Sequence, residues 1–365
     1  MTLHDPQLAN RPNTTSEPSS ASTPGRKTRT VRRPALALGV AALASVAACT
    51  PSATVPAALT PGGFAAAPAF SKAIPAAPWL DANSAAMVRR LSDPTKNRIL
   101  NVGLFGQAVY EASSTTPRVN VQVTNAPGWG DNDLAHVTVP IPAGATPSTG
   151  SDSKLVVIDR SAGQVYDMWD THQTASGWTA GWGGVYPLNG DGTSHNVTYG
   201  SGANQVAWPK PVSRSTGSGI SSLAGLAKID EIAAGRVDHA LVISSTFACG
   251  PANSGPFRYP ATTTDGYDSQ AGCIPEGSRI QLDPSVNLAA IPGILPFELT
   301  LGRALQTHGA YVIDNGGAAI GIVGENPRST ADHETWMKAG VYGDYNGMNH
   351  LPWLSLRVLR SSDGN

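Results

Sequence analysis

From about residue 80 onward, short apolar or alternating runs are separated by segments rich in glycine, proline, serine and threonine. Runs of about four to eight such residues between turn formers are typical of β-strands. One helix is predicted early, over 81–91, where Asp81 can cap the first turn. The predicted strands are 119–123, 137–140, 155–159, 165–169, 236–244, 279–282, 310–314, 319–323 and 354–359.

The spacing of these runs indicates how the chain is organised. A hairpin is predicted around the turn at 160–163. Two more helices are predicted, one within 221–235 that ends at Gly235 and one over 299–307. The pattern favours a mainly β fold: a single β-sandwich or jelly-roll-like domain with two or three short helices.

A different pattern precedes residue 50. The apolar run 34–48 follows five basic residues and is too short to span a bilayer, which is typical of a signal sequence. It ends in Val46-Ala47-Ala48-Cys49, an aliphatic residue, two small residues and a cysteine. These residues resemble the lipobox of bacterial lipoproteins. The resemblance implies diacylation of Cys49, removal of residues 1–48, and an extracytoplasmic protein tethered to the outer face of a membrane.

The export route stays open. The pair Arg32-Arg33 before the apolar run is compatible with twin-arginine export, but residues 34–36 fit that motif poorly, so the general secretory route is the alternative. A buried helix of a cytosolic domain is the competing interpretation of the apolar run. The five preceding basic residues argue against it.

The mature chain is predicted to have two parts. Residues 49–78 are dominated by alanine, proline, threonine and glycine, and Lys72 is their only charge, which is typical of a flexible tether. Residues 79–365 have a length suited to one large β-rich globular domain. Because no second long apolar run follows, lipid on Cys49 is the only predicted membrane anchor.

The net charge of the chain argues against one class of partner, nucleic acids. The chain carries 25 Lys+Arg and 26 Asp+Glu; the predicted leader holds six and two of them, which leaves 19 and 24 and a formal net charge of −5. A nucleic-acid-binding domain is not expected, because it would present a basic face. No nucleotide or phosphate fingerprint occurs, so no cofactor is predicted. The oligomeric state cannot be read from the sequence.

Two cysteines remain once Cys49 is assigned to lipid. An even pair in an exported protein predicts a disulfide between Cys249 and Cys273. The loop between them is rich in glycine, proline, serine and threonine and can bury little apolar surface. The chain-entropy argument gives such a link about 3 kcal/mol. A metal site is the alternative, although no histidine or cysteine at short ligand spacing flanks either residue.

Three separated blocks of sequence look familiar. They are 136–159, 229–241 (IDEIAAGRVDHAL) and 304–316 (ALQTHGAYVIDNG). Together they resemble a broad, mostly uncharacterised group of secreted bacterial proteins that are β-sandwich-like. The resemblance implies no reaction. Members of the group often carry histidine shortly after the aspartate that matches Asp152, whereas this chain has Lys154 there, which puts a metal site at that position in doubt.

Acidic residues near the ends of predicted elements are the candidate catalytic groups. Glu231 and Asp238 flank one turn, with His239 next to it, and Asp314 ends a predicted strand before a Gly-rich turn. Glycoside hydrolysis needs two carboxyl groups, one as acid and one as nucleophile or base. We therefore single out Glu231 and Asp314 as this pair. The assisting residues are predicted to be Asp170, Asp238 and His239.

Each of these residues also has an ordinary structural interpretation. Glu231 can face solvent on its helix, and His239, in an apolar strand, can be a hydrogen-bonded core histidine. Asp314 begins a common turn sequence whose side chains bond the backbone. A sequence alone does not show that such groups converge.

Aromatic residues crowd the segment 174–218, predicted as loops and short strands, and its N-terminal flank. Flat aromatic faces beside hydroxyl and amide side chains suit sugar rings. Packing in a sandwich core is the alternative use of these rings. The predicted ligand-binding residues are Trp169, Trp178, Trp182 and Trp208.

Metal binding is the less favoured chemistry. Asp170 and His172 would share one face of a strand, but two ligands do not make a site. The stretch 265–268 offers oxygen ligands for calcium without the EF-hand pattern. No metal ligand is therefore predicted.

The sequence leads to three hypotheses. The first is a membrane-anchored lipoprotein that binds envelope or environmental polysaccharide and, if it is an enzyme, hydrolyses it with paired carboxylates. The second is a non-catalytic carbohydrate-binding lipoprotein. The third is a structural envelope lipoprotein without a small ligand.

Overall fold

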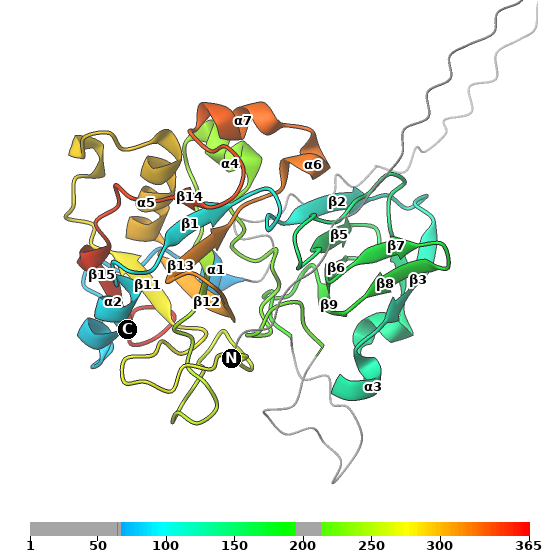
Figure 1. Cartoon of the computed structure of the whole chain (residues 1–365), viewed down its shortest axis with the longest axis horizontal. Coiled ribbons are helices and arrows are strands. Elements are labelled where there is room, and N and C mark those ends of the chain that lie inside the picture. Colours follow the sequence, from blue (N-terminus) through cyan, green and yellow to red (C-terminus); the bar gives the residue numbers. More distant parts are fainter. Residues whose placement is uncertain (1–63, 65–66, 195–212) are drawn as a thin grey trace, which may run out of the picture. The chain divides into compact units, whose positions relative to one another are not determined.

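The computed structural model describes residues 64, 67–194 and 213–365. The predicted leader, Cys49 and Trp208 lie outside the described residues. In the described part, the chain forms three β-sheets joined by long connections and short helices (Figure 1). The mainly β prediction is thereby confirmed.

The largest sheet has seven strands and is mixed. Two pairs of neighbours, β1 with β13 and β10 with β12, are parallel, and the other neighbours are antiparallel. In spatial order the strands are β14 (Asn346–Gly347), β1 (Arg98–Asn101), β13 (Ile320–Val323), β10 (Leu241–Ser245), β12 (Ala310–Asn315), β11 (Arg279–Leu282) and β15 (Leu356–Val358).

The other two sheets have four strands each. One has the order β2 (Ala108–Ala112), β5 (Leu155–Asp159), β6 (Gln164–Trp169) and β9 (Trp182–Pro187). The other has the order β4 (Thr138–Pro140), β3 (Arg118–Val123), β8 (Gly177–Ala180) and β7 (His172–Thr174). Strands β5 and β6 form the antiparallel hairpin that the sequence predicts.

The helices are short, apart from α5. They are α1 (Pro68–Ser71), α2 (Ser84–Leu91), α3 (Ala126–Trp129), α4 (Ile229–Ala234), α5 (Pro296–Thr307), α6 (Pro327–Thr330) and α7 (His333–Lys338). Short 3-10 turns lie at Asp133–His136, Leu288–Ala290 and Trp353–Ser355. Figure 1 shows α4, α6 and α7 near one another and α5 beside the large sheet.

Strand alternation divides the core, because successive side chains point to opposite faces of a sheet. On β10, Leu241 and Ile243 pack with residues of α2, α4, α5 and α7, while Val242 packs with residues of β5 and β6. On β5, Val156 belongs to the core shared with the large sheet, and Val157 to the core between the two four-stranded sheets. The large sheet is therefore covered by helices on one face and by a four-stranded sheet on the other.

The jelly-roll form of the prediction is not confirmed. A jelly roll is built from two antiparallel sheets, whereas the largest sheet here contains parallel pairs and carries helices on one face.

The structure sets the bounds of one predicted helix and of the strand that follows it. The helix predicted at the end of 221–235 is α4, and the Ser221 and Ser222 hydroxyls before it donate to the buried Asp167 carboxylate. It ends at Gly235, whose φ is +66°. The strand predicted from 236 begins at Leu241, so His239 precedes the strand rather than lying within it.

The described part of the predicted tether packs on the globular body. Phe70 is fully buried, and its carbonyl accepts the Ala240 N–H at 2.7 Å. The Tyr311 hydroxyl donates to the Ala69 carbonyl at 2.9 Å. The packed part of the chain therefore begins before Trp79.

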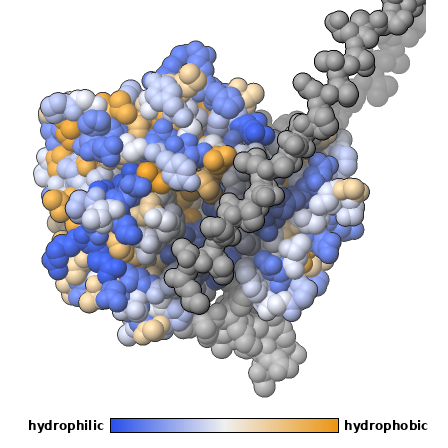
Figure 2. Space-filling model, viewed as in Figure 1, coloured by the Kyte–Doolittle hydropathy of each residue, from blue (hydrophilic) through white to orange (hydrophobic). Residues whose placement is uncertain are grey.

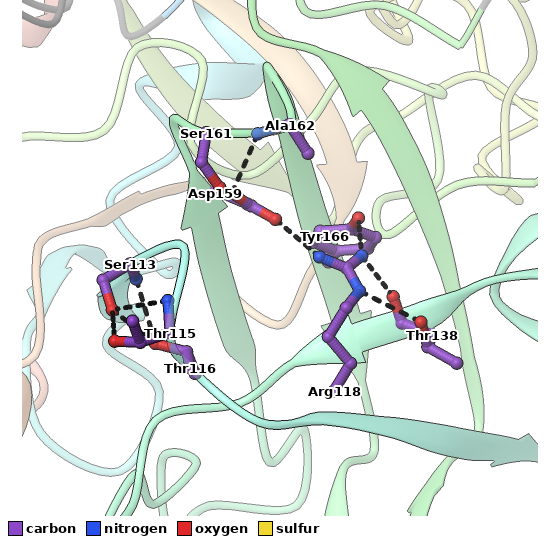
Figure 3. A network of polar contacts seen from close by, with 9 residues as sticks. All are labelled: Ser113, Thr115, Thr116, Arg118, Thr138, Asp159, Ser161, Ala162 and Tyr166. Carbon is purple, nitrogen blue, oxygen red and sulfur yellow. Dashed lines mark hydrogen bonds and ion pairs between the residues drawn. The ribbon is translucent and has the colours of Figure 1, made fainter.

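An ion pair between a buried aspartate and an exposed arginine joins the two four-stranded sheets (Figure 3). Arg118 on β3 lies 2.7 Å from Asp159 at the end of β5, and it also donates to the Tyr166 hydroxyl on β6 at 2.6 Å. Burial alone would raise the pKa of Asp159, but hydrogen bonds from Ser161 and Arg118 outweigh it and hold that pKa below its ordinary value. This network fixes how the two sheets pack.

The surface offers no membrane-spanning element among the described residues: none of their helices is both long and apolar enough to cross a bilayer. On the face drawn in Figure 2, hydrophobic residues occur in small groups between hydrophilic ones.

Candidate functional site

Two parallel strands end side by side at the site. Asp314 and Asn315 end β12 and pair with Ser244 and Ser245 at the end of β10. Ligands commonly bind beyond the carboxyl ends of parallel strands, where loops diverge and polar groups are free of the ladder. The end of β12 is therefore the first place to look for a binding site.

Two cavities meet at Asp314. We call them the amide cavity, of about 420 Å³, and the aromatic cavity, of about 410 Å³. The residues that line both are Asp152, Thr216, Asp314 and Asn315. The amide cavity is also lined by Asn97, Asn101, Phe105, Lys154 and Tyr345. The aromatic cavity is also lined by Trp129, Trp169, Trp182, Arg214, Asp265 and Tyr267.

The aromatic cavity has a platform of packed rings. Trp129 stacks on Trp169 with ring centres 6.2 Å apart, and its edge meets Trp182 at 5.5 Å. Trp182 is buried, but Trp129 is 44% exposed, and Tyr267 across the cavity is 76% exposed. Exposed rings held by buried ones form a rigid apolar surface, which is what a sugar ring stacks on.

Two carboxyl groups flank Gly217 between the cavities. The Gly217 N–H donates to Asp314 Oδ1 at 2.9 Å, and the Asn315 N–H donates to Asp265 Oδ1 at 3.1 Å. A Cβ atom on Gly217 would lie 2.0 Å from Asp265 Oδ1, so a larger residue there would displace the Asp265 carboxylate. The backbone thus holds Asp314 and Asp265 close together.

The disulfide predicted from the cysteine count helps to place Asp265. Cys249 and Cys273 are bonded, with Cα atoms 5.0 Å apart, which confirms that prediction. Within the loop they close, the Thr264 hydroxyl donates to the Cys249 carbonyl at 3.2 Å. The loop is therefore fixed next to Asp265.

Burial and neighbouring charges shift the pKa values of Asp314 and Lys154. Burial, followed by the nearby charge of Asp265, raises the pKa of Asp314 to about 7, against the opposing effects of Lys154 and the Gly217 N–H. Burial alone would lower the pKa of Lys154, but the carboxylates of Asp314 and Asp152 outweigh it and that pKa is raised. Lys154, whose Nζ lies 3.4 Å from Asp152 Oδ2, is therefore a buried cation beside the acids.

A third acid lies behind Asp265. Glu276 is fully buried, and neither of its carboxyl oxygens has a hydrogen bond of good geometry among the described residues. Burial and the adjacent Asp265 raise its pKa well above the ordinary value. Burial of Glu276 therefore favours the neutral form of its carboxyl group.

This arrangement supplies an acid and a base in one cleft. A carboxyl group with a pKa near 7 is poised to donate a proton, and a neighbouring ionised carboxylate can act as nucleophile or base. Within the described ranges, no three histidine, cysteine or acidic side chains are grouped so as to hold a metal ion.

The structure places Glu231, Asp238 and His239 away from both cavities, since none of them lines either one. Glu231 Oε2 accepts the Lys228 N–H at the start of α4, and Glu231 Oε1 lies 2.9 Å from Nε2 of the buried His239. Asp238 pairs with Arg236 at 2.5 Å. His239 is thus a buried histidine beside a carboxylate, whereas Glu231 holds the start of α4 rather than facing solvent.

Of the remaining predicted residues, some line the aromatic cavity and others line neither cavity. Trp169 and Trp182 line the aromatic cavity, whereas Trp178 is buried in the core between the four-stranded sheets. Asp170 has φ +52° and its carboxylate lies 2.8 Å from His172, and neither residue lines a cavity described above. Only the Asp170 backbone reaches the site, through its N–H bond to the Asp152 carbonyl at 2.7 Å.

Several site residues were not singled out from the sequence. Asp265 drew attention only as a calcium candidate, and Asp152 only through the resemblance. Arg214 and Trp129 carried no signal beyond the general crowding of aromatic residues. These residues come together from segments that are far apart in the sequence, and no local sequence pattern indicates that they meet.

Comparison with known proteins adds no identification: no family model, no curated protein and no solved structure matches this chain.

Proposed function

We propose that this protein binds polysaccharide outside the cytoplasm and hydrolyses its glycosidic bonds in the cleft around Asp314. The observation that carries the proposal is the junction of an exposed aromatic platform with two close carboxyl groups. Stacked rings bind the apolar faces of sugars, and unequal carboxyl groups perform the proton transfers of hydrolysis.

The proposed catalytic pair is Asp314 with Asp265. Asp314, whose pKa is near 7, would protonate the leaving oxygen. Asp265, which accepts the Asn315 N–H, would act as nucleophile or general base. Glu231, the partner that the sequence favoured, is replaced in this role because it does not line the cleft.

Hydrolysis is tested on the full chain, produced in a bacterium that processes exported proteins. It is incubated with a panel of envelope and plant polysaccharides, and both binding and release of reducing ends are measured. Asp314→Asn and Asp265→Asn should each abolish release. Asp238→Asn, a matched change outside the cleft, should leave it intact. Release that survives both cleft substitutions would show that the carboxyl pair is misassigned.

Binding without hydrolysis is the second candidate. It is favoured by the backbone N–H bonds that Asp314 and Asp265 both accept, since such fixed carboxylates also suit the hydroxyl groups of a ligand. In that case the same panel gives saccharide binding that Asp314→Asn weakens, with no reducing ends released.

We also propose that lipid on Cys49 anchors the protein at the outer face of a membrane. The support is the match of residues 46–49 to the lipobox pattern. Mass spectrometry of the membrane-extracted protein should find Cys49 as a lipid-modified N-terminus. The variant Cys49→Ala should leave the membrane fraction, and an unprocessed, unlipidated full chain would contradict the assignment.

A further inference from the structure

The two cavities adjoin at Asp314, which lines both of them. Each has a volume within the range of small-molecule sites, about 300–1,000 Å³. Four residues belong to both linings, so the two cavities adjoin at these residues. A ligand long enough to occupy both must therefore pass over the acids.

The two sides of the cleft differ in chemistry. The aromatic side offers ring faces, which stack on any sugar whatever its substituents. The other side offers amide groups: in the described part of the chain, no protein group bonds the side chains of Asn97 and Asn315. An amide that both donates and accepts is suited to a second amide on the ligand.

Apolar side chains lie next to these amides. Val242, Ile313 and Val323 line the same cavity, beside Phe105 and the exposed Tyr345, whose rings are in edge contact at 6.0 Å. An acetamido group presents one methyl, one N–H and one carbonyl. The acetamido group matches this cavity wall. Its methyl group can pack against the apolar side chains while its N–H and carbonyl form hydrogen bonds with the asparagine amides.

Resting on the proposed function, the geometry points to a chain of N-acetylated sugars as the substrate. Consecutive units would occupy both cavities, with the linkage over Asp314 and an acetamido group in the amide cavity. The aromatic cavity supplies affinity that does not depend on the substituent. The amide cavity supplies the preference for the N-acetyl group. Because chain continues on both sides of the acids, cleavage would occur within chains rather than at their ends.

The probes are chitohexaose and cellohexaose, which share the β-1,4 linkage and differ in the acetamido group. Binding to the full chain is measured by calorimetry for wild type, Asn97→Ala, Asn315→Ala and Trp129→Ala. We expect chitohexaose to bind at least about tenfold more tightly than cellohexaose and more tightly than chitobiose. Each asparagine change should weaken the binding of chitohexaose about three- to tenfold and leave the affinity for cellohexaose unchanged. Trp129→Ala should weaken the binding of both hexaoses.

The outcomes separate the two proposals. Equal affinity for the two hexaoses, or asparagine variants that bind chitohexaose like wild type, overturns the N-acetyl assignment while polysaccharide binding stands. Chitobiose binding as tightly as chitohexaose overturns the two-cavity occupancy. Failure of the full chain to bind either hexaose or any polysaccharide of the panel overturns the proposed function itself.

Discussion

Asp314→Asn should make the protein more stable at alkaline pH. The carboxylate of Asp314 is held near Asp265 in a partly buried cleft, and its pKa is raised from 3.8 to about 7. A carboxyl group whose pKa is raised by folding binds its proton more tightly in the native state. Its ionisation therefore destabilises the fold, and this cost develops as the pH rises from about 4 to about 7.

The size of the effect follows from the shift. At about 1.4 kcal/mol per pKa unit, the full shift corresponds to about 4 kcal/mol above pH 7. Asp314 is partly exposed to water in the cleft, which screens the repulsion, so we expect about 1–2 kcal/mol. An asparagine side chain has nearly the same shape as that of Asp314 but carries no charge. Lys154 stays paired with Asp152 in the variant, so no buried cation is left alone.

The assay is urea unfolding followed by tryptophan fluorescence at pH 4 and at pH 8. The free energy of unfolding of Asp314→Asn should equal that of wild type at pH 4 and exceed it at pH 8. Asp238→Asn, an exposed aspartate paired with Arg236, serves as the control and should show no such pH-dependent gain. If Asp314→Asn is less stable than wild type at pH 8, the carboxylate is a structural group and the electrostatic reasoning is wrong.

Three further changes probe the framework around the cleft. Cys249→Ser should lower the free energy of unfolding by about 2–4 kcal/mol, because the loop closed by Cys273 loses its link; an unchanged urea midpoint under oxidising conditions would argue against this. Gly217→Ala should reduce both saccharide affinity and thermal stability, since its Cβ would lie 2.0 Å from a carboxylate oxygen, and calorimetry measures both. Asp159→Asn should cost about 1 kcal/mol at pH 7, because it removes the ion pair to Arg118, whose side chain is 39% exposed and stays partly hydrated. Since folding lowers the pKa of Asp159, that loss should be present near pH 7 and disappear as the pH falls below about 4, which unfolding curves at both pH values test.

Local elements were predictable where the pattern was strong. The hairpin of β5 and β6 follows from two apolar runs and a short turn, and both strands lie within one residue of the predicted bounds. Strand β12 was predicted to within one residue, because Ala310–Asn315 is bounded by glycine on both sides. Such segments depend on their own residues and immediate neighbours.

Elements governed by distant contacts were not predictable. The hydrogen bonds of Ser221 and Ser222 with Asp167 join residues more than fifty positions apart, and no local pattern indicates them. Strand β1 was missed because Arg98–Asn101 is short and its pairing with β13 spans most of the chain. The arrangement of the sheets depends on such pairings as well.

The candidate site shows the same division. Asp314 was found because it ends a strand before a Gly-rich turn, which is a local signal. Its partner Asp265 belongs to the disulfide loop, and Gly217 joins the two from a third segment. Nothing within any one of these segments indicates that they meet. Glu231 was preferred because it lies beside a turn. In the structure it contacts Lys228 and His239, which are near it in the sequence, and not the cleft.

The most direct test of the account measures polysaccharide binding by the full chain and two tryptophan variants. Trp129 lies in the aromatic cavity and is 44% exposed, whereas Trp79 is 61% exposed and packs on Arg360 outside both cavities. The account predicts that at least one polysaccharide of the panel binds wild type and Trp79→Ala equally. Trp129→Ala should bind that polysaccharide at least about tenfold more weakly. If no polysaccharide binds, or if Trp129→Ala binds as tightly as Trp79→Ala, the cleft is not a saccharide site.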